Sequence, residues 1–188
     1  MKDGLVALTG GAGGVGARLV EALQRRGYLV RALEHRRPVP AADERLRGDL
    51  LDPAAVTELV AGAHGVVHAA AVTHVRSSRG YGPVNVEGTR ILLGAAAAAG
   101  VSRFVYVSTH AIDEVGGGGY SRSKAEAERL VAASGLETVV VRLPEVVGGG
   151  GREGVDRLLA AARAGRPLLV VGRGAHELRP VHVDDVAA

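Results

Sequence analysis

The chain has 188 residues, of which 47% are hydrophobic and 23% charged, and this suffices for one α/β domain with a sizeable core. A net charge of +3 on scattered basic residues, with only four tyrosines and one phenylalanine to stack on bases, argues against nucleic-acid binding. We expect no signal peptide, membrane span or membrane partner, because no apolar run is long enough. The lack of cysteine excludes disulfides and thiolate chemistry and fits a cytoplasmic protein.

A glycine-rich turn follows the first apolar run, residues 5–8, and precedes apolar residues with helical spacing. Strand, glycine-rich turn and helix in this order are typical of dinucleotide binding. The glycines permit a tight turn and let a pyrophosphate approach backbone N–H groups at the helix N-terminus. A plain turn between strand and helix is the alternative, because 28 residues are glycine. The predicted pyrophosphate-binding residues are Gly10, Ala12, Gly13, Gly14, Val15 and Gly16.

A second strand, residues 28–33, ends at Glu34, which lies 18 residues after Gly16. A carboxylate at this place in a dinucleotide fold hydrogen-bonds the ribose 2′-OH and repels a 2′-phosphate, which favours NAD. Arg36 and Arg37 follow at once and would suit the 2′-phosphate of NADP, so NADP stays possible. The alternative is that all three charges belong to a solvated loop.

The next elements are a short strand over 46–51 and a helix that begins at Asp52-Pro53, residue types suited to the N-cap and N1 positions. Asp49 is predicted either to accept a hydrogen bond from the adenine amino group or to serve the turn. A strand over 65–71 ends in Ala69, Ala70 and Ala71, small side chains that leave room for a flat ring.

No metal site is predicted. His68 is more typical of a buried histidine with satisfied hydrogen bonds than of a catalyst. His64 and His68 make a poor metal pair, and no cluster of further ligands supports one.

The second half of the chain continues the alternation of strands and helices, and residues 84–99 form its longest predicted helix. Small and apolar residues lie nearly all round that helix, so we expect burial on both sides, against the sheet and against a second subunit. The whole pattern predicts a doubly wound, mostly parallel Rossmann-type sheet with helices on both faces, in a single domain spanning 1–188. The other predicted elements are loops at 73–83, 110–119 and 148–151, strands at 103–108, 139–143 and 168–171, helices at 120–133 and 153–164, and the start of a last helix after 179–185.

Tyr120 and Lys124 lie four residues apart on a predicted helix, so their side chains share one face. A phenol has a pKa near ~10, and a nearby ammonium would lower that pKa toward neutrality. Thr109, at the end of the preceding strand, can hydrogen-bond the same substrate oxygen, and Lys124 can also hold the nicotinamide ribose. The three form a candidate acid–base site; the alternative is an exposed aromatic beside a solvated lysine.

With these residues in place, the chain resembles the extended short-chain dehydrogenase/reductases, in particular the NAD-dependent epimerase/dehydratase group. The resemblance covers nearly the whole sequence. Its motifs are Thr9-Gly10-x-x-Gly13-x-x-Gly16, Gly48-Asp49-Leu50-x-Asp52, His68-x-Ala70-Ala71, Asn85-Val86-x-Gly88-Thr89, Val107-Ser108-Thr109, Tyr120-x-x-x-Lys124, Arg142-x-Pro144 and Val181-His182-Val183-Asp184-Asp185-Val186-Ala187.

The resemblance implies a site for NAD, with pyrophosphate on residues 10–16, ribose at Glu34 and adenine at Asp49. It also implies catalytic roles for Thr109, Tyr120 and Lys124 and a homodimer packed through helices 84–99 and 120–133. Further residues implied near the cofactor or substrate are Leu50, Asn85, Val107, Leu143 and Pro144.

Three features depart from this family. Members continue for on the order of a hundred residues beyond the His182-Val183-Asp184-Asp185 motif, so the region that forms much of the substrate pocket is expected to be largely absent. The loop from Thr109 to Tyr120 is short. His110-Ala111 stand where sugar dehydratases carry Asp-Glu, so dehydration by that pair is not expected.

The sequence therefore predicts an NAD(P)-dependent oxidoreductase or epimerase that transfers hydride at a hydroxyl or carbonyl carbon of a small or nucleotide-sugar substrate. Tyr120 would be the acid/base. Two alternatives remain open: a non-catalytic NAD(P)-binding sensor, or a simple NADP-dependent ketone or aldehyde reductase.

Overall fold

Six parallel strands form the centre of the protein, in the order β3-β2-β1-β4-β5-β6. We describe the chain from a computed structural model, which covers residues 4–75, 78–113, 118–149, 154–168, 173 and 177–188. The strands of the sheet are β1 (Leu5–Thr9), β2 (Leu29–Glu34), β3 (Glu44–Arg47), β4 (Gly65–His68), β5 (Arg103–Thr109) and β6 (Thr138–Leu143). This is the doubly wound Rossmann-type sheet that the sequence predicts.

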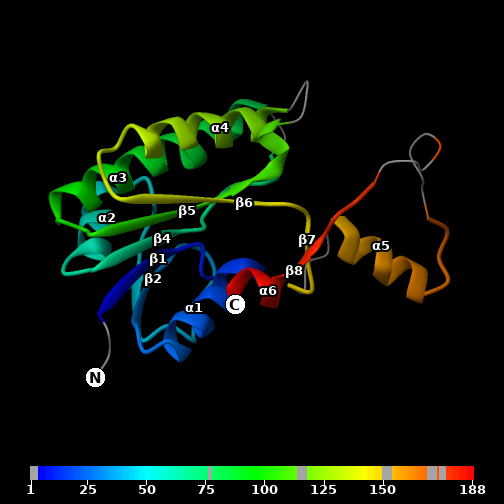
Figure 1. Cartoon of the computed structure of the whole chain (residues 1–188), viewed down its shortest axis with the longest axis horizontal. Helices are drawn as coiled ribbons and strands as arrows, with labels where there is room; N and C mark the ends of the chain where they lie inside the picture. The colour runs from blue at the N-terminus through cyan, green and yellow to red at the C-terminus, as the bar shows by residue number, and fades with distance from the viewer. Residues whose placement is uncertain (1–3, 76–77, 114–117, 150–153, 169–172, 174–176) are drawn as a thin grey trace.

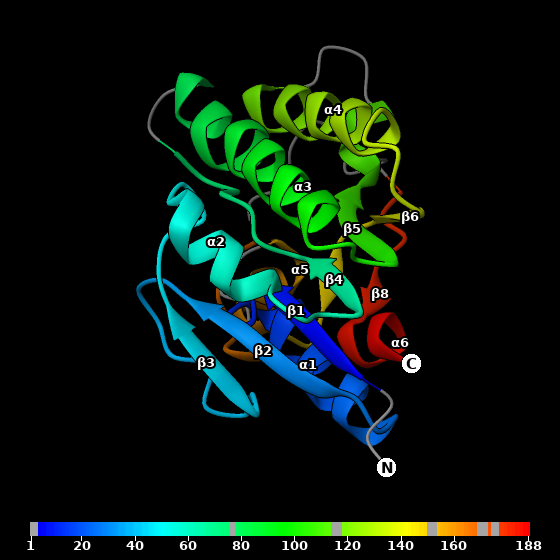
Figure 2. The ribbon, with the colours of Figure 1, turned by 90° about the vertical axis from the view of Figure 1, so that its left-hand side faces the viewer.

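Helices cover both faces of this sheet (Figure 1). α1 and α6 lie on one face, whereas α2, α3 and α4 lie on the other; Figure 2 shows the same two layers from the side. α5 and the short β7–β8 pair follow the sheet and extend from it. The helices are α1 (Gly14–Arg25), α2 (Pro53–Val60), α3 (Thr89–Ala98), α4 (Gly119–Ala132), α5 (Gly154–Arg163) and α6 (Val183–Ala187), and the short strands are β7 (Val146–Val147) and β8 (Val181–His182).

The order of the strands reverses between β1 and β4, which are neighbours in the sheet although β2 and β3 separate them in sequence. Thr9 at the end of β1 is paired in register with His68 at the end of β4, and Thr109 at the end of β5 with Leu143 of β6. The carboxyl ends of these strands therefore meet at one edge. In open α/β sheets ligands bind at this edge, beside the point of reversal.

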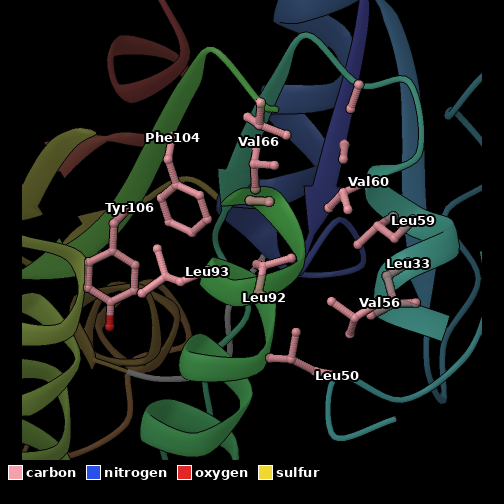
Figure 3. Packing of buried hydrophobic residues seen from close by; sticks show 14 of the residues in the cluster. Leu33, Leu50, Val56, Leu59, Val60, Val66, Leu92, Leu93, Phe104 and Tyr106 are labelled. Atoms are coloured by element: carbon pink, nitrogen blue, oxygen red, sulfur yellow. The ribbon is translucent and has the colours of Figure 1, made fainter. Parts of the chain in front are cut away.

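Two apolar clusters hold the layers together. The larger lies between the sheet and α2, α3 and α4, and Figure 3 shows its side chains, among them Leu92, Phe104 and Tyr106. The smaller lies between the sheet and α1 and includes Leu8 and Val20. Phe104 and Tyr106 point to the same side of β5 because side chains two residues apart in a strand share a face.

Three predicted elements differ from the structure. The strand predicted over 65–71 is β4, which ends at His68, and residues 69–71 have no regular structure. The strand predicted over 46–51 is β3, which ends at Arg47, because residues 48–51 form the turn before α2 instead. The helix predicted over 84–99 is divided: Pro83–Gly88 form a π-helical turn, labelled η2, and α3 follows without a break. In η2, the Asn85 side chain hydrogen-bonds the backbone of Val72, in the segment after β4. The turn therefore connects that segment to α3.

Smaller differences concern the loops. Ser78–Tyr81 (η1) and His110–Asp113 (η3) form 3₁₀ turns within predicted loops, and neither β7 nor β8 was predicted. In the predicted strand 168–171, residue 168 has no regular structure and the others lie outside the described residues. None of the helices among the described residues is long and apolar enough to cross a membrane.

We predict that Phe104→Ala lowers the free energy of unfolding by about 3–5 kcal/mol, because it leaves a cavity at a fully buried position in the larger cluster. Leu51→Ala, at a side chain 38% exposed, is the control and should cost under about 1 kcal/mol. Urea denaturation followed by circular dichroism measures both; equal losses would contradict this account of the core.

Candidate active site

The turn between β1 and α1 is held by two close backbone contacts at Gly10. Its φ is +80°, and a Cβ there would lie 2.5 Å from the backbone of Ala69 and Ala70, just after β4. On the other side, a Cβ on Gly16 in α1 would overlap the carbonyl oxygen of Gly10. The turn is therefore pressed between the start of α1 and the end of β4, and no side chain fits at either glycine.

A cavity of about 430 Å³ opens on this turn. Two of its lining residues are cationic: Arg18, which also pairs with Glu21 and Asp184, and Arg37. The positive end of α1 and these guanidinium groups favour a bound anion. The cradle thus fits the pyrophosphate of a dinucleotide. It is lined by Ala12, Gly13, Gly14, Ala17, Arg18, Arg37, Gly148 and Gly149, while Val15 is half-buried in the first turn of α1.

Glu34 ends β2, as the sequence predicts, and its Oε1 accepts a hydrogen bond of 2.7 Å from the Val39 backbone N–H. Val39 is buried and packs over Gly11, so this bond closes the loop after β2 onto the glycine turn. Arg36 is exposed and does not line the cavity, whereas Arg37 does. Of the two arginines that follow Glu34, Arg37 is therefore the one that lies next to the turn.

Asp49 accepts a hydrogen bond from the backbone of Leu51 at 2.9 Å and lies 3.3 Å from the His35 ring. Asp49 thus stabilises the turn, which is one of the two roles that the sequence analysis gives it; the other is a hydrogen bond to adenine. The Leu50 side chain is buried in the larger cluster, in contact distance of Gly88. Leu50 can therefore offer only its backbone to a cofactor.

His68 is fully buried, and both of its ring nitrogens have partners. Thr89 donates its hydroxyl proton to the Asn85 carbonyl, so it accepts from His68 Nε2 at 2.8 Å. His68 Nδ1 then accepts from the Thr9 hydroxyl at 2.6 Å. Burial, and next the positive charge of Lys124, lower the pKa of His68 to about 3. This neutral histidine joins β1, β4 and α3, the structural role that the sequence indicates.

The Thr9 hydroxyl, bonded to His68 in this way, also accepts from the backbone N–H of Ala70 at 3.3 Å, and the Thr9 carbonyl accepts from Ala69. Ala69, Ala70 and Ala71 are half-buried directly after β4. These bonds fix the small residues beside Gly10, where the sequence analysis expects the flat ring.

Tyr120 and Lys124 lie one turn apart at the start of α4, which packs over the end of β5. The Tyr120 ring is half-buried, with its centroid 5.9 Å from that of Tyr81. Burial, and next the Tyr81 phenol, raise the pKa of Tyr120. Thr109 ends β5, and its hydroxyl accepts from the Ala111 N–H at 3.2 Å.

Lys124 is 2% exposed, and its ammonium points into the layer between α4 and β5. Nζ donates to the Val107 carbonyl at 2.7 Å and lies 4.0 Å from the centroid of the Tyr106 ring. Burial lowers the pKa of Lys124 to about 7, and the Glu128 carboxylate opposes that shift. The pKa of Tyr120 is thus raised by burial and by Tyr81, whereas the sequence analysis expects the Lys124 ammonium to lower it.

Asn85 connects the site to the chain after β4. Its side chain accepts from the Val72 N–H at 2.8 Å and donates to the Val72 carbonyl and to Ser123 Oγ, both at 3.0 Å. The buried amide thus ties η2, α4 and the segment after β4 together. Leu143 and Pro144 are half-buried at the end of β6, next to Thr109 in the sheet.

Sequence reasoning did not find Tyr81 or Tyr106. Neither carries a motif, because their importance comes only from which rings the fold places beside Tyr120 and Lys124. Among the residues the structure describes, no group of three or more histidine or acidic side chains could hold a metal ion.

The chain matches the model of the NAD dependent epimerase/dehydratase family over residues 6–188. It belongs to that family. It is 36% identical over 190 residues to a ceramide reductase of Caulobacter vibrioides, covering 98% of this chain and 59% of the relative. It is 34% identical over 208 residues to a 2-alkyl-3-oxoalkanoate reductase of Stenotrophomonas maltophilia, covering 97% of this chain and 62% of the relative. The chain thus spans about three fifths of the length of these relatives.

Solved structures of the family share the fold. MoeE5 in complex with UDP-glucose and NAD superposes with a TM-score of 0.84 at 30% identity, over 97% of this chain and 69% of that one. The similarity covers nearly the whole of this chain, so the two proteins share the fold that carries the glycine turn and the sheet.

We predict that Gly16→Ala abolishes dinucleotide binding or prevents folding, because its Cβ would overlap the Gly10 carbonyl and displace the turn. The control is Gly94→Ala in α3, where nothing lies within 4 Å of the added Cβ. That variant should gain up to about 1 kcal/mol of stability from helix propensity. Isothermal titration with NAD and thermal melts measure both; a Gly16→Ala variant that binds like the wild type would refute the contact.

We predict a pH dependence of stability from His68. Its folded pKa, about 3, lies below its ordinary value of 6.5, so the unfolded chain binds the extra proton between these values. His68 therefore contributes stability above pH 6.5 that is lost as the pH falls toward 3, by at most about 1.4 kcal/mol per pH unit. The difference in unfolding free energy between wild type and His68→Gln, from urea titrations at several pH values, should show this slope.

Proposed function

We propose that this protein is an NAD(P)-dependent oxidoreductase of the extended short-chain dehydrogenase/reductase type, in which Tyr120 moves the proton. The observation that carries the proposal is the position of Tyr120 and Lys124, one turn apart at the carboxyl end of β5 and on the sheet edge that holds the glycine cradle. The cradle binds the pyrophosphate, and the substrate oxygen meets Tyr120 and Thr109.

In the proposed reaction each residue has one task. The nicotinamide, when bound, supplies or accepts the hydride at the substrate carbon. In reduction the Tyr120 hydroxyl gives its proton to a carbonyl oxygen, and in oxidation the Tyr120 phenolate takes the proton of a substrate hydroxyl. The Thr109 hydroxyl hydrogen-bonds the same substrate oxygen. Lys124 holds the nicotinamide ribose and supplies positive charge near the phenolate that Tyr120 becomes after donating. Because burial keeps the pKa of Tyr120 high, the phenol is protonated at neutral pH and suited to donate.

We propose NAD as the cofactor, with NADP as the second candidate. Glu34 at the end of β2 supports NAD, and the related MoeE5 structure holds NAD. Arg37 in the cradle is the observation that favours NADP. Separate calorimetric titrations of wild type and Arg37→Ala with the two cofactors distinguish them. If Arg37 binds the 2′-phosphate, Arg37→Ala weakens the binding of NADP and leaves the binding of NAD unchanged.

Two substrate classes follow from the relatives. Three relatives at 33–36% identity are named as a ceramide reductase, a 2-alkyl-3-oxoalkanoate reductase and a 3 beta-hydroxysteroid dehydrogenase/Delta 5-->4-isomerase, which supports an apolar ketone or alcohol. MoeE5, at 30%, was solved with UDP-glucose, which supports a nucleotide sugar. We propose the apolar class, since the Tyr81 ring lies beside Tyr120 and a protonated phenol favours carbonyl reduction.

We also propose a cytoplasmic homodimer. Small side chains, Gly94, Ala97 and Ala98, are exposed along α3, and α4 lies next to it in the same layer. Such residues let two helix pairs approach closely, as the resemblance implies for helices 84–99 and 120–133. Sedimentation of Ala97→Glu, which would place charge in that contact, tests the dimer.

We predict that Tyr120→Phe lowers kcat by about 10²–10⁴-fold while the dissociation constant of the cofactor stays unchanged, because only the proton transfer is lost. The assay follows NADH or NADPH absorbance with a 3-oxoalkanoate, a ketosteroid and UDP-glucose. Tyr28→Phe, directly before β2 and at the opposite end of that strand from Glu34, is the control and should keep full activity. Turnover by Tyr120→Phe within a few-fold of wild type refutes the mechanism; cofactor binding without turnover of any substrate supports the sensor alternative.

A further inference from the structure

We propose that the Glu128–Arg142 ion pair acts on Lys124: Arg142 on β6 fixes the Glu128 carboxylate, and the negative charge of that carboxylate keeps the buried Lys124 ammonium charged. The inference rests on the proposed function for its consequence in catalysis. Its geometry is independent of that function.

The pair bridges two elements next to the site. The Nε of Arg142 donates to Glu128 Oε1 and Oε2 at 3.1 and 3.3 Å, and its terminal nitrogen donates to Oε2 at 2.8 Å. The Glu128 side chain is 12% exposed and that of Arg142 is 42% exposed. A two-pronged contact of this kind fixes the orientation of the carboxylate as well as its position.

Helix geometry places that carboxylate beside Lys124. Tyr120, Lys124 and Glu128 lie four residues apart in α4, so they form one row along the helix, and the last two are an opposite-charge neighbour pair. Burial alone would raise the pKa of Glu128. The hydrogen bonds from Arg142 and Ser108, together with the positive charges of Arg142 and Lys124, outweigh burial, so the pKa is lowered and the carboxylate stays ionised.

The remaining groups that face Lys124 do not replace this negative charge. On β5, the Val107 carbonyl accepts a hydrogen bond from the ammonium and the Tyr106 ring lies next to it, but neither carries a negative charge. Burial raises the pKa of the Tyr106 phenol and keeps it neutral. On β4, His68 is neutral, since its own pKa is lowered. Tyr120, on α4 itself, has a raised pKa and is neutral too.

Among the described residues, then, Glu128 is the anion that offsets the burial of Lys124. The pKa of Lys124 is about 7, so a modest loss of negative charge shifts the ammonium from about half populated to a minority at neutral pH. An uncharged Lys124 would neither stabilise a Tyr120 phenolate nor bind the ribose as a cation. The ion pair thus acts through Lys124, without touching substrate or cofactor.

The composition of the chain allows a direct test, because it contains only two lysines, Lys2 and Lys124. Selective ¹³C labelling of lysine yields two Cε signals, and Lys124→Arg assigns them. We expect Glu128→Gln to lower the pKa of Lys124 by about one pH unit, which cuts its charged fraction at pH 7 roughly five-fold. Glu126→Gln, at an exposed position on the same helix, is the matched control and should leave the titration of Lys124 unchanged.

A second variant changes the orientation of the Glu128 carboxylate without changing the net charge. It also provides the test if Glu128→Gln does not fold. Arg142→Lys keeps the positive charge but cannot make the two-pronged contact, so we expect the pKa of Lys124 to fall in the same direction. Either of two results overturns the proposal: a Lys124 titration unmoved in the folded Glu128→Gln and Arg142→Lys variants, or an equal change in Glu126→Gln. The titration needs neither cofactor nor substrate, so an inactive chain, which would refute the proposed function, leaves this test intact.

Discussion

The close approach of three backbone segments at Gly10 is the constraint on which the cofactor edge depends. Gly16 brings the start of α1 onto the Gly10 carbonyl, and Ala69 and Ala70 lie against Gly10 from β4. β1 and β4 are adjacent because the strand order reverses here, and α1 can begin directly over the turn only if no side chain intervenes. The cradle is therefore made by backbone packing, and its anion affinity follows from the helix end and the arginines that this packing leaves around it.

The second feature that organises the site is a polar layer buried between α4 and the sheet. Burying a lysine costs free energy unless its charge is compensated. Here the Val107 carbonyl and the Tyr106 ring supply partial compensation, and Glu128 supplies the full charge. His68 and Asn85 extend the same layer with satisfied hydrogen bonds toward β1 and the segment after β4. The hydrogen bonds of His68 and Asn85 favour this arrangement of the elements, because moving the elements apart would leave their buried donors and acceptors unpaired.

Sequence patterns predicted the sheet, its helices and the place of the glycine turn. The strands and helices follow from the local periodicity of apolar residues, and the turn follows from glycines at positions where a side chain would not fit. They failed where tertiary contacts decide. β3 ends at Arg47 because Leu50 turns into the core against Gly88, a contact remote in sequence. Arg37 rather than Arg36 lines the cradle because Val39 anchors the loop on the core. Three consecutive valines, 139–141, read as an ordinary strand, yet they are exposed because β6 is the edge of the sheet.

The candidate acid–base pair shows the same division between motif and environment. The spacing of Tyr120 and Lys124 was readable from the chain, but their pKa values were not, since these depend on burial and on Tyr81 and Glu128. The fold raises the pKa of the phenol and lowers that of the ammonium, so near neutrality the tyrosine holds its proton while the lysine is poised to change charge. A phenol that holds its proton is an acid for a carbonyl oxygen. On the proposed function, the environment of this pair therefore favours reduction of a carbonyl group over oxidation of an alcohol at neutral pH, and rising pH shifts the balance toward the reverse reaction.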